Sequence, residues 1–323
     1  MENENVWNDL FEILHDDIVR EDTFPHTAPL LTHYTSMTNL ENILTNNELW
    51  LSNPLHMNDL EEVRFGVLSG MNIIERHEEL AASLGNDDRR KRFSEHLHRT
   101  FNDYSNEHVI DLYLVCFSKQ EPDDNDGKLS MWRGYGQNGR GAAIVFDASK
   151  VKVTEDSPLA LAPVQYGTQE QRRSAIERKI TDVARLISQS SIPDDYMEHL
   201  ADVIFKRICL YAIFTKHSGF AEESEWRLVY LKDRDKAATL EPYLSYFNGP
   251  NGFEPKLKLP LAPIKGAVDE TLDLSSVVHR VIVGPTVSSP LARRSIERML
   301  EKIGKPELKS KIWMSEIPYR DRL

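Results

Sequence analysis

The chain has 323 residues, 40% of them hydrophobic and 28% charged, as expected for a globular protein that buries a large core without metal or disulfide staples. Its formal net charge of −12 excludes broad, charge-driven binding to duplex nucleic acid, but leaves room for a local basic groove. No apolar run approaches the roughly 20 residues that span a bilayer. The acidic N-terminus lacks the pattern of a secretion signal, so we expect a cytoplasmic protein.

The first elements follow from apolar spacing and capping residues. Residues 1–24 contain apolar positions at helical spacing and predict an N-terminal helix docked on the core. The apolar start at Leu31 predicts a strand. A short helix follows, with a capping-box pattern from Thr38 to Glu41 and a stop at Asn46-Asn47. Leu49-Trp50-Leu51 predicts the next strand.

Two long segments, 61–108 and 168–215, are predicted as helical insertions because apolar stripes at helical spacing run through charged sequence. Between them, short apolar runs predict buried strands at 112–118 and 142–147. The glycines from Gly136 to Gly141 do not form a phosphate loop, because they precede a strand and the Lys-Ser/Thr ending is missing.

The remaining elements mix strands and helices without a regular βαβ rhythm. We predict strands at 226–230, 277–283 and 308–314, and a helix over 291–303 capped by Ser288 or Ser289. The Pro/Gly-rich stretch 242–263 is interpreted as an irregular excursion. The predicted fold class is therefore α+β, in a single domain spanning residues 1–323.

Polar residues gather at the ends of the predicted strands, where functional sites usually lie. His33 and Tyr34 stand side by side on the first strand; the alternative is a half-buried pair with satisfied hydrogen bonds. Because side chains alternate along a strand, Glu223, Glu225 and Arg227 are expected on one face. The alternative there is a salt bridge between Glu225 and Arg227. Cys116 and Cys209 have no metal-ligand or redox spacing and are expected to be buried free thiols.

Seven stretches carry a family resemblance: Leu31–Ser36, Trp50–Asn53 with Asn58, Asp59 and Glu62, Cys116–Ser118, Met131–Gly136, Phe220–Arg227, Ile282–Pro285 and Ile317–Arg320. Taken together, they resemble a bacterial family known as domain of unknown function 2971. This resemblance spans most of the chain but implies no activity.

A second resemblance is to ADP-ribosyltransferases, which bind NAD in the cleft of a split sheet with three separated motifs. His33-Tyr34-Thr35 is similar to the first motif, Ser118 or Trp132 with Tyr135 to the second, and Glu223-Ser224-Glu225 to the third. The resemblance implies a mixed or split β-sheet core with NAD as substrate and no metal. The residues that it implies for NAD binding are His33, Tyr34, Thr35, Ser52, Ser118, Trp132, Tyr135 and Arg227.

The catalytic roles implied by this resemblance fall to His33, Glu223 and Glu225. Cleavage of the nicotinamide–ribose bond develops positive charge that a carboxylate stabilises, which is the role of Glu225. His33 would orient the ribose, Tyr135 or Trp132 would stack on the nicotinamide, and Glu223 would position the acceptor. This interpretation requires residues 33, 135 and 225 to line one cavity.

These roles suit a bacterial toxin or anti-phage defence effector that modifies a protein or nucleic acid and is restrained by an antitoxin or another regulatory protein. A different class of function stays open: a non-catalytic module that binds a nucleotide or single-stranded nucleic acid by stacking on His33, Tyr34, Trp132 and Tyr135. A third alternative is a hydrolase built on Asp59, Glu62, Glu223 and Glu225, with a divalent cation.

Overall fold

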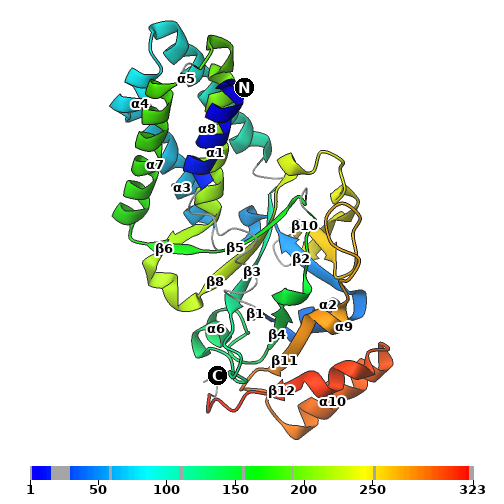
Figure 1. Cartoon of the computed structure of the whole chain (residues 1–323). Coiled ribbons are helices and arrows are strands. Elements are labelled where there is room, and N and C mark those ends of the chain that lie inside the picture. Colours follow the sequence, from blue (N-terminus) through cyan, green and yellow to red (C-terminus); the bar gives the residue numbers. More distant parts are fainter. Residues whose placement is uncertain are drawn as a thin grey trace. The chain divides into compact units, whose positions relative to one another are not determined.

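The computed structural model describes residues 2–15, 30–57, 60–108, 112–154, 157–190, 192–249 and 252–319. The contacts among them divide the chain into two compact units (Figure 1). Unit 1 comprises Met1–Val19, Asn53–Leu112 and Val164–Ala221, and unit 2 comprises Arg20–Ser52, Tyr113–Pro163 and Glu222–Leu323. Both predicted helical insertions fall in unit 1. The assignment of residues 1–323 to a single domain stays a prediction.

Unit 1 is a helical bundle arranged around one central helix. Its helices are α1 (Glu2–His15), α3 (Leu60–Arg76), α4 (Glu78–Ser83), α5 (Asp87–Asp103), α7 (Gln169–Gln189) and α8 (Met197–Ile213). Helix α8 is buried along most of its length and packs against α3 and α5. At Gly66 a Cβ would lie 2.7 Å from Cβ of Ala212, so glycine allows α3 to approach α8 closely. A short parallel pair, β6 (Gln165–Gly167) and β7 (Thr215–His217), completes the described part of this unit.

Unit 2 is organised on a mixed sheet. Its strands are β1 (Leu30–Thr35), β2 (Glu48–Ser52), β3 (Tyr113–Lys119), β4 (Ala142–Asp147), β5 (Leu159–Pro163), β8 (Glu225–Tyr230), β9 (Leu244–Gly249), β10 (Gly252–Pro260), β11 (Val278–Val283) and β12 (Ile312–Met314). The main order is β12-β11-β4-β1-β3-β2-β10-β9, and β8 joins β3 to β5. The pairs are antiparallel except β11–β12, which is parallel. The predicted α+β class with a mixed sheet is confirmed at this level.

The two faces of this sheet have different coverings. One face carries the larger core, in which Leu31, Phe117, Ile144 and Trp226 are buried. The other carries a smaller cluster formed by Tyr34 and Trp132 with residues of β4 and β11. Unit 2 also contains α2 (Met37–Asn46), α6 (Leu129–Gly134), α9 (Leu274–Val277) and α10 (Pro290–Lys302).

Several local predictions need correction. Ser36, and not Thr38, caps α2, because its side chain accepts a hydrogen bond from the backbone N–H of Asn39. The stop of α2 is confirmed by Asn47, which adopts the left-handed conformation with φ 58°. The excursion at 242–263 contains the antiparallel pair β9–β10. Residues 308–311, predicted as the start of a strand, belong instead to a 3-10 turn, Pro306–Lys311, before β12.

Of the predicted N-terminal segment 1–24, helix α1 ends at His15, and residues 16–24 lie outside the described residues. Among the described helices, none combines the length and the apolar character that crossing a membrane requires. Cys116 and Cys209 are free thiols; Cys209 is buried as predicted, whereas Cys116 is half-buried.

We expect Gly141→Ala to destabilise unit 2 by about 1–3 kcal/mol, because a Cβ at this position would overlap the carbonyl oxygen of Thr35 on β1. The measurement is denaturant unfolding followed by tryptophan fluorescence. Gly134→Ala at the end of α6 is the matched control, since a Cβ there meets nothing within 4 Å and the free energy of unfolding should change by no more than about 0.5 kcal/mol. Equal effects of the two substitutions would contradict the close approach at Gly141.

Candidate functional site

Three neighbouring strands of unit 2 bring the predicted motifs to one level of the sheet (Figure 1). Thr32 on β1 lies opposite Ser118 on β3, and Ser118 lies opposite Glu225 on β8. Residues directly opposed on adjacent strands point to the same face. Thr32, Ser118 and Glu225 therefore form a polar row across the three strands, although they lie far apart in the chain.

The sheet forks beside this row. Strand β1 pairs with β4 along its whole length, but its registered pairs with β3 are at Leu31 and Thr32. The start of β3 pairs instead with β2, through Leu114 and Ser52. His33 stands at the fork, where its Nδ1 donates a hydrogen bond to the carbonyl oxygen of Cys116 at 3.1 Å. The imidazole thus provides a hydrogen bond to a β3 carbonyl at the point where β1 and β3 diverge. Burial lowers the pKa of His33 from its ordinary value.

The sheet register places His33 and Glu225, which were expected to meet, on opposite faces of the sheet. Phe117 and Trp226 follow the polar row on the opposite face, and the ring of His33 lies edge-on to Phe117 with centroids 6.0 Å apart. His33 therefore faces the side of the larger core, whereas Glu225 faces the side of Ser118. This corrects the expectation that the imidazole and the carboxylate converge on one cavity with Tyr135.

Glu225 and Arg227 form a buried ion pair on β8. Nε of Arg227 donates to one carboxylate oxygen of Glu225 at 2.7 Å, and a second guanidinium nitrogen donates to the other at 3.2 Å. The two residues are 4% and 0% exposed. The prediction that Glu225 and Arg227 share one face of the strand is confirmed. The salt bridge between them, given as the alternative to a functional role, is present. The side chain of Glu225 is thus withdrawn from solvent.

A partly exposed polar cluster surrounds Ser118 on the same face. Its hydroxyl donates to the carbonyl oxygen of Glu223 at 2.6 Å and accepts from Nζ of Lys128 at 3.1 Å. The phenol of Tyr135 donates to the carboxylate of Glu223 at 2.9 Å. Ser118 is buried, Glu223 and Lys128 are half-buried, and Tyr135 is 41% exposed. Ser118, Tyr135 and Glu223, three of the predicted site residues, are therefore brought together.

The ammonium of Lys128 adds a cation to this cluster through its hydrogen bond to the Ser118 hydroxyl. Burial lowers the pKa of Lys128 from its ordinary value, while the nearby carboxylate of Asp124 opposes that shift. Nζ of Lys128 also lies 3.4 Å from the carbonyl oxygen of Glu222. Lys128 could not be recognised from the sequence, because its position in an acidic loop indicates only solvation and its contacts depend on the tertiary fold.

Several residues predicted to hold NAD have structural roles instead. Trp132 is 0% exposed, and its indole N–H donates to the carbonyl oxygen of Asp126 at 2.8 Å. Tyr34 is buried against Trp132, accepts from the backbone N–H of Lys128, and has a pKa raised by burial. Thr35 is buried and accepts from the amide of Asn39. Trp132 and Tyr34 therefore cannot offer a stacking face, which corrects that expectation.

Ser52 belongs to another part of the sheet. Its hydroxyl accepts from Nζ of Lys256 on β10 at 2.9 Å, and Lys256 is paired with Glu254 at 2.9 Å. Ser52 is opposite Leu114 at the start of β3, so it lies at the far end of that strand from Ser118. Its predicted role in holding NAD stays a prediction.

The carboxylates proposed for a hydrolase do not form a described cluster. Asp59 and the side chain of Glu62 lie outside the described residues, and within the described residues no group of three His, Cys, Asp or Glu side chains is placed to hold a metal ion. Glu223 and Glu225 point to separate partners, Tyr135 and Arg227.

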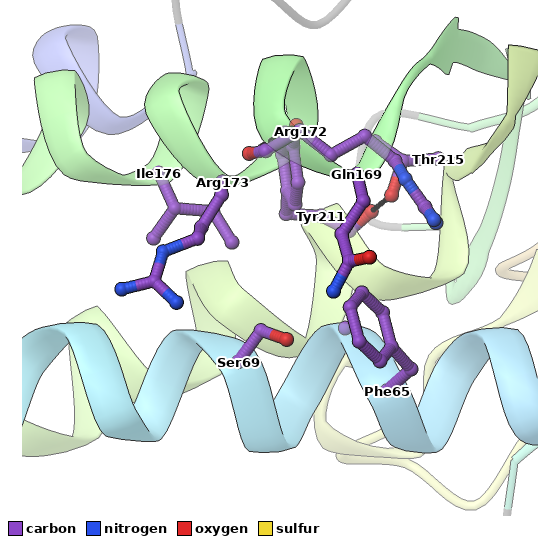
Figure 2. A pocket seen from close by; sticks show the side chains of 9 residues that line it. Phe65, Ser69, Gln169, Arg172, Arg173, Ile176, Tyr211 and Thr215 are labelled. Atoms are coloured by element: carbon purple, nitrogen blue, oxygen red, sulfur yellow. Dashed lines mark hydrogen bonds between the residues drawn. The ribbon is translucent and has the colours of Figure 1, made fainter.

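A separate hollow lies in unit 1 between α3, α7 and α8 (Figure 2). Gln169 and Arg173 extend from α7 toward α3, with the amide of Gln169 nearest Phe65 (Figure 2), and the guanidinium of Arg172 lies over the ring of Phe65 at 5.4 Å. Arg173 is also paired with Glu177 at 3.4 Å. None of the residues predicted for a site lines this hollow.

We expect Arg227→Met to lower the free energy of unfolding by about 3–5 kcal/mol, because it removes the guanidinium that is paired with the buried Glu225 carboxylate. The double variant Glu225→Leu with Arg227→Met should recover most of that loss, since it removes both charges. A double-mutant cycle of denaturant unfolding measures the coupling. Arg293→Met at the more exposed pair with Glu297 on α10 is the control, with a change of at most about 1 kcal/mol. A single and a double variant of equal stability would contradict the buried pair.

The lowered pKa of His33 predicts a pH dependence of stability. The unfolded chain binds a proton at this histidine more readily than the folded chain, so stability falls as pH decreases through the unfolded pKa of about 6.5 and levels off below the folded pKa. The slope from this residue is at most about 1.4 kcal/mol per pH unit. Between pH 7.5 and about 5, the free energy of unfolding should fall more for the wild type than for His33→Gln. His98→Gln, at an exposed position on α5, should retain the slope of the wild type. Parallel curves for wild type and His33→Gln would contradict the prediction.

The comparisons with known proteins support the family resemblance. Residues 131–228 match the family model described as Protein of unknown function (DUF2971). This range contains Tyr135, Glu223 and Glu225 of the candidate site. Neither a curated protein nor a solved structure gives a significant match. Over residues 131–228, the chain is therefore similar to the DUF2971 family.

Proposed function

We propose that unit 2 is an ADP-ribosyltransferase-like domain that uses NAD as its substrate. The observation that supports this proposal is the register of β1, β3 and β8. It places the segments similar to the three transferase motifs on three adjacent strands, with Thr32, Ser118 and Glu225 opposed. The fork between β1 and β3 is also what the split sheet of such a fold requires. A cytoplasmic toxin or anti-phage effector restrained by an antitoxin is the setting that this proposal includes.

The accessible atoms suggest how the roles are divided. Tyr135 offers an exposed ring for the nicotinamide, and the Glu223 carboxylate beside it accepts hydrogen bonds from ribose hydroxyls. Glu225 lies behind them on the same face, where a buried carboxylate stabilises positive charge that develops at the ribose as nicotinamide leaves. Its pair with Arg227 holds it ionised and fixed in orientation.

The acceptor would enter beside Glu223. A carboxylate at the solvent edge of the site can take a proton from an attacking hydroxyl or amine, or orient it toward the ribose carbon. Lys128, whose Nζ is 3.1 Å from the Ser118 hydroxyl, supplies a cation for the pyrophosphate oxygens of NAD. His33 retains Nε2 for a contact at the fork, because its Nδ1 is engaged by Cys116.

A second candidate function is a module that binds a nucleotide or single-stranded nucleic acid without turnover. Two observations favour it. The Glu225 carboxylate is neutralised by a buried guanidinium, and His33 faces the other side of the sheet. In this case Tyr135 would stack on a base, and Glu223 would accept from a ribose hydroxyl without any bond being broken.

Free nicotinamide released from NAD by the intact protein decides between these functions. In the transferase, Glu225→Gln should lower the rate by about 10²–10³-fold, since it removes the charge that stabilises the transition state. Glu223→Gln and Tyr135→Ala should each weaken NAD turnover at least tenfold. Glu222→Gln is the matched control, because this neighbouring carboxylate is exposed, and its rate should stay within about twofold of the wild type.

Each other outcome of the nicotinamide assay has a definite meaning. NAD binding by the wild type without nicotinamide release, lost in Tyr135→Ala, would replace the transferase by the binding module. Neither binding nor turnover of NAD would overturn both functions.

A further inference from the structure

One segment of unit 2 carries an excess of positive charge, although the protein is acidic overall. Residues 290–311, which comprise α10 and the following 3-10 turn, carry seven basic and three acidic side chains, whereas the whole chain has a formal net charge of −12. Figure 1 shows α10 in orange and red beside β11 and β12.

The basic residues of α10 are presented on its outer side. Ile296 and Leu300 are buried in the larger core of unit 2 and fix the inner face of the helix. Arg294, Arg298 and Lys302 are exposed and follow one another at intervals of four residues. With a rise of 1.5 Å per residue, their Cα atoms form a row with a spacing of about 6 Å along the helix. The side chains therefore make a linear array of positive charge.

Nearby acidic residues neutralise this array incompletely. Glu297 is 3.1 Å from Arg293 and 3.7 Å from Arg294, and Glu301 pairs with Lys309. These ion pairs are partly or largely exposed, so each contributes little and exchanges readily with another anion. Lys305 and Lys311 have structural partners, Asn47 and the backbone carbonyls of Ser275 and Val278, and are not counted in the array.

Hydrogen bonds connect the loop before α10 to the segment that carries Tyr135. The turn after α6 is bonded to the loop before α10, because the backbone N–H of Thr286 donates to Gly139 and its hydroxyl donates to Asn138. Exposed Arg140 lies in this turn, and exposed Arg133 on α6 has its guanidinium 5.2 Å from the ring centroid of Tyr319. Basic side chains thus occur in the two connected segments that lead from the candidate site to α10.

We propose that the outer face of α10 binds the phosphodiester backbone of a nucleic acid, which would make nucleic acid the acceptor class of the proposed transferase. A row of arginine and lysine side chains at regular spacing matches a polymer with regularly spaced phosphates, and arginine binds phosphate oxygens through two parallel hydrogen bonds. Since the counted charges are exposed, binding is driven by counterion release and depends steeply on salt. The acceptor assignment rests on the proposed function, but the binding itself does not.

Fluorescence anisotropy of labelled single-stranded DNA, single-stranded RNA and duplex DNA, without NAD, tests the binding. The wild-type chain should bind at least one of them at about 50 mM salt, with an affinity that falls linearly on a logarithmic scale as salt increases. The triple variant Arg294→Gln, Arg298→Gln and Lys302→Gln should lose at least tenfold in affinity. Its salt slope should fall by about 2, the loss of three phosphate contacts on a single strand.

The matched control changes three exposed basic residues in unit 1: Arg90→Gln, Lys91→Gln and Arg92→Gln on α5. It alters the net charge equally and keeps good helix formers, so its affinity should stay within about twofold of the wild type. No binding by the wild type, or equal losses in both triple variants, would overturn the proposal. Stronger binding to anionic lipid vesicles than to nucleic acid, with the same dependence on α10, would also overturn it.

Nicotinamide release from NAD alone should be the same in the α10 variant as in the wild type. A failure of the nucleic-acid proposal is thereby separated from a failure of the transferase proposal, because each assay has its own variant and its own ligand.

Discussion

The polar row from Thr32 through Ser118 to Glu225 is the constraint on which the arrangement of unit 2 depends. Each of these side chains is buried in the middle of a sheet, where a polar group without a partner costs about 1–3 kcal/mol. The partners come from connecting segments: Gln120 for Thr32, and Glu223 and Lys128 for Ser118. Satisfying the row therefore fixes the loop after β3 and the turn before β8. These two segments place Glu223 beside Tyr135 and Lys128 beside Ser118.

The same constraint divides the site into an interior and a rim. Glu225 and Arg227 form the interior, and a buried pair of this kind contributes more to a defined geometry than to net stability. Tyr135, Glu223 and Lys128 form the rim, where a ligand can reach them. A residue of the interior can influence a reaction through its field, whereas binding and proton transfer fall to the rim. The chemistry of this site depends on how much negative potential the Glu225 carboxylate exerts at the rim while it is paired with Arg227.

The sequence was informative where one local signal determines the structure. Apolar runs located β3, β4 and β11, and Asn47 marked the end of α2. It failed where the outcome depends on distant partners. The face occupied by His33 follows from register, and an offset of one residue moves a side chain to the other face. Trp132 in its Gly-rich stretch was expected to be an accessible stacking residue. In the structure it is buried against Tyr34, which is distant in the chain, and its indole N–H donates to the carbonyl oxygen of nearby Asp126. The Pro/Gly-rich composition of 242–263 predicted an irregular excursion, yet β10 in this stretch pairs with both β2 and β9.

The net charge of −12 and the basic face of α10 act over different distances. At physiological ionic strength, charges separated by more than about 8 Å are largely screened from each other when they are exposed to solvent. A phosphate in contact with Arg294 or Arg298 therefore responds to the few charges within that distance, and those of α10 are mainly positive. The acidic remainder of the chain opposes approach from afar at low salt and limits non-specific binding elsewhere on the surface. The basic outer face of α10 on an acidic protein thus favours binding of an anionic polymer along this helix.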